Sequence, residues 1–189
     1  YLRIESRFLV NLNEKHMRKH RDQLCNEEGC SEIWFDEDVQ LAHYKLPANC
    51  KFIGQTLLQT KFRSNYGCNI LQITTPQAVI DMPGADYILE PASTLLIIGT
   101  REQFKMFNAA VASKQIDLEP LDEPISLRQF MLQSNEEKPE LQFLSLAITV
   151  DEHSKLLGKS IKDANIRENW SALVLGLERG AYTITNPNI

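Results

Sequence analysis

The sequence predicts an α/β (α+β) fold made of two similar modules, each a small mixed or antiparallel sheet with two helices, behind an amphipathic leading helix. Three observations support this class. Residues 54–83 reappear as residues 158–187 at a constant offset of 104. Segments whose apolar side chains alternate, as in strands, are interspersed with segments whose apolar side chains recur at helical spacing. The 189 residues are 43% hydrophobic and 24% charged, which is an ordinary globular composition.

The repeat keeps identical residues at its turns and conservative ones between them. The identities include Gly54/Gly158, Arg63/Arg167, Asn65/Asn169, Leu71/Leu175 and Pro83/Pro187, and the conservative pairs include Leu57/Ile161 and Ile70/Val174. Two copies that bury the same face would keep this set. A repeated unit without a catalytic signature indicates binding or assembly.

The leading segment, residues 1–35, reads as a helix followed by a connector. Ile4, Phe8 and Leu12 recur at helical spacing within residues 1–21. Six basic and two acidic side chains give residues 1–21 a net charge of +4, whereas the whole chain carries −5. A basic amphipathic helix suits the cytoplasmic side of a membrane. The alternative is a solvated basic helix that packs on its own domain.

The first module spans residues 36–113. Its expected elements are an alternating strand near 41–46, a short helix after Gly54, strands near 68–73 and 94–98, and a helix over 101–113. The continuous apolar run at 94–98 predicts a strand covered on both faces. Three prolines mark residues 114–140 as a linker. The second module, 141–189, is incomplete, because it lacks counterparts of the strand 94–98 and the closing helix.

Several classes of protein are excluded by composition. No run of 18 apolar residues occurs, so nothing here spans a bilayer. The acidic body argues against nucleic acid as a partner. The eight glycines never adopt the spacing of a dinucleotide fold or a P-loop. Four cysteines without a secretory signal favour reduced thiols and a cytoplasmic setting. The start at Tyr1, without Met, suggests a part of a longer protein.

Two weak constellations have an ordinary explanation. His16, His20, Cys25 and Cys30 include a histidine pair on one helix face and could complete a tetrahedral zinc site. Their spacing is unfamiliar and their neighbours are basic, so we expect an ordinary segment and no metal. Residues 151–154, Asp-Glu-His-Ser, are adjacent and cannot form a triad, so we expect a capping turn.

The motifs and their order resemble the TrkA-C (RCK-C) domain. They are Phe52-Ile-Gly-Gln-Thr-Leu-Leu, then Phe62-Arg63, Tyr66-Gly67 and Asn69-Ile70, and finally Glu90 to Gly99. The second copy, from Leu157 to Gly180, is similar. Together the resemblances cover residues 38–113 and 141–189. They imply a small α/β module of potassium channels and cation transporters that dimerises, senses a ligand and has no chemistry of its own.

The resemblance also implies a ligand site. In some relatives a cyclic dinucleotide lies at the dimer interface, and the corresponding positions here are Arg63, Asn69, Ile70 and Pro83, with Arg167 in the second copy. Arginine binds phosphate bidentately and asparagine reads a base edge, so these residue types suit a nucleotide. The alternative is that Arg63 and Asn69 make only structural contacts. Leu173 replaces Asn69 in the second copy, which puts a second equivalent site in doubt.

Residues 2–13 resemble the stretch after the last transmembrane helix of CPA2-type monovalent cation:proton antiporters. We therefore expect a regulatory region at the cytoplasmic face of the inner membrane, homodimeric, attached to a transmembrane transport domain for K⁺ or Na⁺ and gated by a small ligand such as a nucleotide. It is not expected to be an enzyme. The alternative is the TrkA-C module of a potassium uptake or channel system, or of an anion permease.

Overall fold

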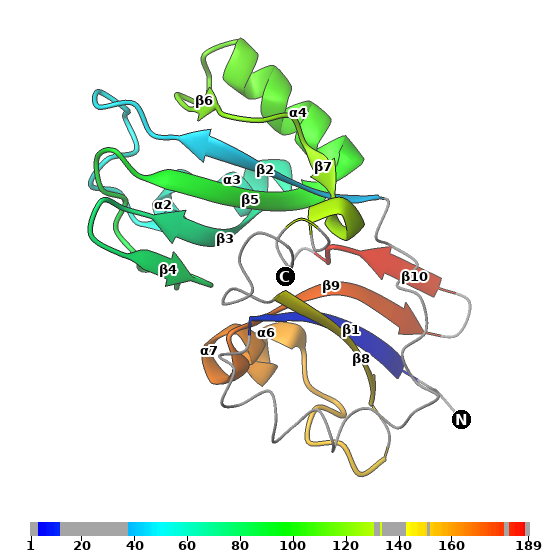
Figure 1. Cartoon of the computed structure of the whole chain (residues 1–189). Helices are drawn as coiled ribbons and strands as arrows, with labels where there is room; N and C mark the ends of the chain where they lie inside the picture. Colours follow the sequence, from blue (N-terminus) through cyan, green and yellow to red (C-terminus); the bar gives the residue numbers. More distant parts are fainter. Residues whose placement is uncertain are drawn as a thin grey trace. The chain divides into compact units, whose positions relative to one another are not determined.

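The computed structural model describes residues 4–11, 38–130, 133, 143–150, 152–179 and 182–187. The chain folds into two compact units. We call Asp36–Phe130 the first unit, and Tyr1–Phe35 together with Met131–Pro187 the second unit. Each contains one copy of the repeat. Figure 1 labels the elements of both.

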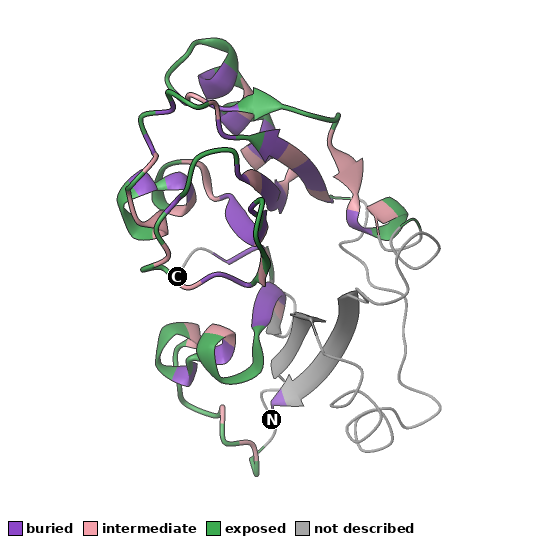
Figure 2. Cartoon of the chain, turned by 60° about the vertical axis from the view of Figure 1, so that its left-hand side comes forward, coloured by how far each residue is buried: buried purple, intermediate pink, exposed green. Residues whose placement is uncertain are grey.

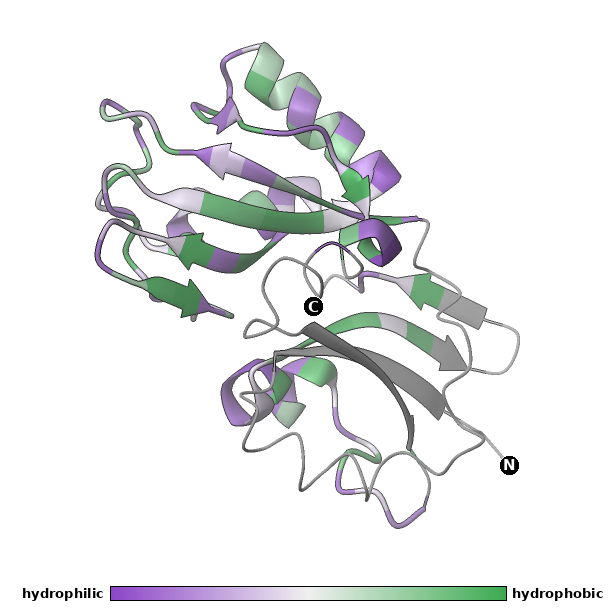
Figure 3. Ribbon diagram, in the orientation of Figure 1, coloured by the Kyte–Doolittle hydropathy of each residue, from purple (hydrophilic) through white to green (hydrophobic). Residues whose placement is uncertain are grey.

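The first unit is built on an antiparallel sheet. Its strand order is β4-β3-β5-β2-β6, and β7 also pairs with β2. The bounds are β2 Val39–Lys45, β3 Asn69–Thr74, β4 Val79–Asp81, β5 Thr94–Thr100, β6 Glu119–Pro120 and β7 Ile125–Ser126. The five residues from 95 to 99 on the central strand β5 are all buried, as the continuous apolar run predicts (Figures 2 and 3).

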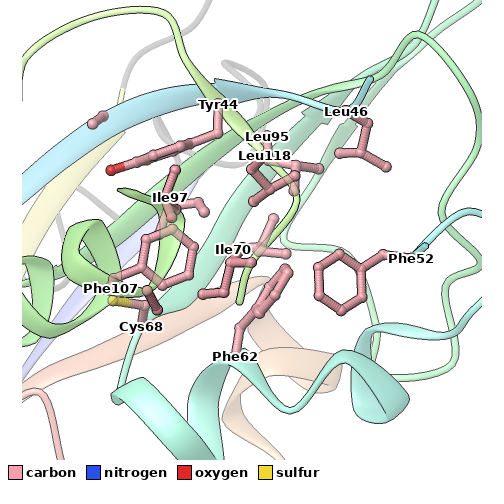
Figure 4. Packing of buried hydrophobic residues seen from close by; sticks show 14 of the residues in the cluster. Tyr44, Leu46, Phe52, Phe62, Cys68, Ile70, Leu95, Ile97, Phe107 and Leu118 are labelled. Carbon is pink, nitrogen blue, oxygen red and sulfur yellow. The ribbon is translucent and has the colours of Figure 1, made fainter. Parts of the chain in front are cut away.

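The helices that accompany this sheet include α2 Leu57–Thr60, α3 Phe62–Tyr66 and α4 Arg101–Ala112. Residues 127–130 at the end of the unit are also helical. The Thr100 side chain caps α4 in a capping box with Gln103. Phe107 of α4 is 0% exposed and meets the rings of Tyr44 and Phe62 edge to face (Figure 4). It meets the ring of Tyr66 in the same way. The core therefore lies between α3, α4 and one face of the sheet.

The segment after α4 differs from the predicted linker. Residues 114–127, which we call the return segment, run back along the first unit. Ile116, Leu118 and Leu127 are 2%, 4% and 0% exposed. The Cys50 thiol donates to the Asp117 carbonyl at 2.9 Å. Burial of these three apolar side chains stabilises the packing of this proline-containing segment against the first unit.

The second unit contains a four-stranded sheet of order β10-β9-β1-β8. The bounds are β1 Ile4–Asn11, β8 Phe143–Val150, β9 Ala172–Arg179 and β10 Tyr182–Thr185, with helices α6 Ile161–Ala164 and α7 Ile166–Trp170. A small core formed by Ala164, Ile166, Ala172 and Val174 joins α6 and α7 to β9. The fold class is thus confirmed: each unit is a small antiparallel sheet with helices.

The predicted leading helix is wrong for residues 4–11, which form strand β1. β1 pairs antiparallel with β8 on one side and β9 on the other. The sequence IESRFLVN alternates at period two as well as at helical spacing, and two long-range strand partners decide between the two readings. Residues 12–35 of the predicted helix and connector lie outside the described residues.

β1 occupies in the second sheet the place that β5 holds in the first. β1 lies between β9 and β8, and β5 lies between β3 and β2. In the repeat, β9 corresponds to β3 and β8 corresponds to β2. Phe8 pairs with Val174 as Ile97 pairs with Ile70. Each repeat strand also carries its register shift at the same point, around Leu71 and around Leu175. The second unit therefore completes its sheet with a strand from the start of the chain.

In the described part of the chain, no helix combines the length and apolar character needed to cross a membrane.

Candidate functional site

The predicted ligand-binding residues of the first unit lie where α3 meets β3. Lys61 adopts a left-handed conformation (φ 57°) and separates α2 from α3. Gly67, also left-handed at φ 71°, ends α3 and donates its N–H to the Arg63 carbonyl at 2.8 Å. This turn leads directly into β3. It fixes Arg63 shortly before the first buried residues of that strand.

Arg63 presents a partly buried cation at this junction. Its Nε atom is removed from solvent, and burial lowers the pKa of Arg63. A guanidinium stays protonated in proteins despite such a shift. The junction therefore carries a positive charge.

Asn69 and Ile70 begin β3 and are 4% and 5% exposed. Their backbones pair with the central strand β5. Pro83 is also buried. It follows Met82, whose N–H donates to the Leu71 carbonyl at 2.7 Å. The structure thus ties Arg63, Asn69, Ile70 and Pro83 to connected segments at one end of β3.

The second unit builds the same junction with one difference. Arg167 lies on α7, and its Nε atom is buried like that of Arg63. The N–H of Asn186 donates to the Leu175 carbonyl at 2.6 Å, as Met82 does to Leu71. However, Leu173, 6% exposed, stands where the first unit has Asn69. The cation recurs, whereas the amide is confined to the first unit.

The repeated positions also share their surroundings. Ile70 and Val174 are 5% and 4% exposed and belong to the cores of their units. Leu57 and Ile161 are half-buried and pack against those cores. The common packing that the repeat predicts is therefore observed at both pairs.

An arginine, an amide and apolar neighbours can bind a ligand, but they are not acids or bases at neutral pH. The guanidinium can pair with phosphate, and the amide can both donate and accept. This arrangement favours recognition over chemistry.

The two weak constellations add no site. His16, His20, Cys25 and Cys30 lie outside the described residues. Within the described ranges, no three His, Cys, Asp or Glu side chains gather to hold a metal. Ser154 accepts a hydrogen bond from the Leu156 N–H at 3.2 Å, so this part of the Asp-Glu-His-Ser stretch is a turn.

Sequence reasoning missed a polar contact in the first unit. Asp122 of the return segment meets both the N–H and the ring of His43 on β2. The partners are 79 residues apart. No local pattern indicates such a pairing, because only the folding back of the return segment brings them together.

The first unit is a small α/β module with Arg63 and Asn69 at one end of β3. The family model of the TrkA-C domain matches residues 41–112. This match supports, for residues 41–112, the resemblance to the TrkA-C domain that the first copy shows in its sequence.

A relative extends beyond that domain. An uncharacterized transporter of Synechocystis sp. is 26% identical over 140 residues, which cover 74% of this chain and 22% of that protein. The chain thus spans about a fifth of the length of this curated relative.

Solved structures that match part of this chain include two RCK proteins. The GsuK RCK domain is 25% identical, with a TM-score of 0.38, covering 52% of this chain and 20% of that one. The RCK C domain of the potassium transport protein KtrA, in complex with cyclic diadenosine monophosphate, is 28% identical, with a TM-score of 0.32. That match covers 36% of this chain and 79% of the KtrA domain.

Proposed function

We propose that the chain is the regulatory, ligand-sensing region of a membrane monovalent cation (K⁺ or Na⁺):proton antiporter, placed at the cytoplasmic face. The observation that carries this proposal is the TrkA-C domain at residues 41–112. The alignment with a transporter is about twice as long as that domain, which supports a shared arrangement beyond it. The resemblance of residues 2–13 to CPA2 antiporters supports monovalent cations as the transported ions and antiport with protons as the mode of transport.

The second unit is, in this proposal, a second TrkA-C module in tandem. Its support is geometric. The repeat strands of both sheets shift register at matching residues. Gly54 and Gly158, the matching glycines before α2 and α6, have φ values of 79° and 75°. Independent folds would have no reason to share both features.

The ligand we propose is a nucleotide, such as a cyclic dinucleotide, bound in the first unit of each member of a homodimer. Arg63 would hold a phosphate, Asn69 would read a base edge, and Ile70 and Pro83 would pack beside the ligand. Arg167 offers a cation without the neighbouring amide, so we assign no equivalent site to the second unit.

Transmission to the transport domain would pass through β1. A strand paired on both sides moves with its sheet, whereas a free helix would not be tied to it. A ligand that prefers one arrangement of the dimer would shift the population toward it and thereby change the position of β1. This strand replaces the helix that the sequence predicts as the connecting element.

Isothermal titration of the chain tests the sensing role, with cyclic diadenosine monophosphate, ATP and K⁺ as separate probes. We expect one nucleotide to bind, Arg63→Ala to weaken it at least about tenfold, the scale for a charged hydrogen-bonded contact, and the matched Arg167→Ala to leave it unchanged. If none of the probes binds, the sensing role is wrong. Equal losses in both variants would contradict the assignment to the first unit.

Sedimentation of the same chain tests dimerisation independently. A concentration-dependent dimer is expected, and a monomer at all concentrations would contradict this part of the proposal. Transport by the complete protein, measured with K⁺ and Na⁺ against a proton gradient, distinguishes an antiporter from a channel or an anion permease.

A further inference from the structure

The outer edge of β2 in the first unit is covered by the return segment. β7 and β6 pair antiparallel with β2 near its two ends. Between them, the Leu121 N–H donates to the His43 carbonyl at 2.9 Å, and the His43 N–H donates to Asp122 Oδ1 at 2.6 Å. The fold therefore accepts a further antiparallel segment on this side of the sheet.

β8 is the counterpart of β2 in the second unit. The repeat offset of 104 matches Leu146 with Ala42 and Ile148 with Tyr44. β8 pairs with β1 along all eight residues and is the last strand in the order β10-β9-β1-β8. Within the ranges that the structure describes, no strand lies on its other side. The edge that the return segment covers in the first unit thus has no described partner strand in the second.

The sequence of β8 lacks the usual protection of an edge strand. Natural sheets protect their edges with short strands, charged residues, prolines or bulges. β8 has the sequence FLSLAITV, which is eight residues long and contains no charge, proline or glycine. Its ladder with β1 runs without a register shift. By contrast, the edge strand β4 of the first unit has three residues and ends at the charged Asp81. β8 is therefore suited to pairing on both sides.

We propose that β8 pairs antiparallel with β8 of a second copy of the chain, so that the two four-stranded sheets join into one. A two-fold axis makes such a contact self-complementary, because each residue that meets a partner residue is met by it in return. All eight residues are uncharged, so the pairing brings no like charges together. The inference rests on the proposed homodimer and assigns its contact to the second unit.

Hydrogen exchange measured by mass spectrometry on the whole chain tests this contact. The exchange is compared at protein concentrations about tenfold below and about tenfold above the dimer midpoint found by sedimentation. The amides of residues 143–150 that do not pair with β1 should exchange about fourfold more slowly at the higher concentration, because the fraction of monomer falls by that factor under mass action. Residues 39–45 of β2, whose outer edge is already covered, are the matched control and should not change with concentration.

A charge introduced into β8 gives a second test. Ala147→Lys places a lysine near the middle of the strand, where pairing with a second copy would bring two like charges together. We expect the dimer midpoint to rise at least about threefold. Thr183→Lys, in the other edge strand β10, is the matched control and should leave the midpoint unchanged.

Four outcomes would overturn the inference. A dimer in which residues 143–150 exchange equally fast at both concentrations would show that the copies meet elsewhere, and the proposed homodimer would stand. Slow exchange at both concentrations would show that the same chain already covers this edge. Equal midpoints for Ala147→Lys and the original chain would exclude β8 as the contact. A chain that stays monomeric at all concentrations would overturn the inference and the homodimer together.

Discussion

Replacing Phe107 with alanine should remove the centre of the first unit's aromatic core. Phe107 is 0% exposed and contacts three rings edge to face, with centroid distances of 5.2, 5.6 and 5.7 Å. Truncating a buried phenylalanine to alanine costs about 3–5 kcal/mol, and the ring pairs keep this site from the lower end of that range. We expect a loss of about 4 kcal/mol out of the roughly 5–15 kcal/mol available to a domain.

Hydrogen exchange in β3 and β5 measures this loss within the first unit. Each 1.36 kcal/mol is about a factor of ten, so 4 kcal/mol corresponds to about a thousandfold faster exchange. Phe107→Leu keeps most of the apolar volume and should lose less. Met106→Ala is the control, because Met106 is 53% exposed on the same helix and should change exchange by no more than about twofold. An acceleration below about tenfold in folded Phe107→Ala would refute the packing described here.

Three further predictions concern the backbone, a helix cap and pH. Gly67→Ala should lower the free energy of unfolding more than Gly54→Ala. Both glycines have φ above 70°, but only at Gly67 would an added Cβ also lie 2.4 Å from Gln103 Nε2. Equal midpoints of unfolding in urea for the two variants would contradict this. Thr100→Ala should cost about 1 kcal/mol by removing the α4 cap, and Thr100→Ser should restore most of it in the same assay. Burial raises the pKa of the Cys68 thiol from 9.0 to about 12. Between these pH values the folded state keeps a proton that the unfolded state loses, so the free energy of unfolding should decrease as the pH rises from about 9 to about 12. In Cys68→Ala, which carries the residue found at the matching position of the second unit, the free energy of unfolding should decrease less over this pH range. An identical decrease in the variant and the original chain would show that Cys68 is not its cause.

Much of the first unit could be predicted from the sequence because its signals are local. The run from Leu95 to Ile98 is apolar without interruption, and Thr100 with Gln103 forms a recognisable cap before a helix. The repeat also indicated which positions share a packing scheme. These signals depend only on neighbouring residues or on the comparison of one copy with the other.

The wrong predictions arose where distant partners decide the structure. Ile4 and Phe8 fit a helix, but they also fit a strand once β8 and β9 supply hydrogen bonds from more than 130 residues away. The prolines at 120 and 124 suggested a linker, whereas the buried side chains around them hold the return segment to the first unit. At the candidate site, Arg63 and Asn69 were found by resemblance, and the His43–Asp122 contact could not be, since it depends on tertiary folding.

The position of β1 in its sheet has a consequence for synthesis. Within this chain β1 is translated first, whereas the two strands that flank it end at Val150 and Arg179. At about 5–20 residues per second, the ribosome takes on the order of ten to thirty seconds to deliver both. The first unit has all its own strands well before then. Residues 4–11 must therefore wait, backbone exposed, while a complete domain forms behind them, and this interval is when chaperone binding or pairing with a neighbouring nascent chain would compete with the native sheet.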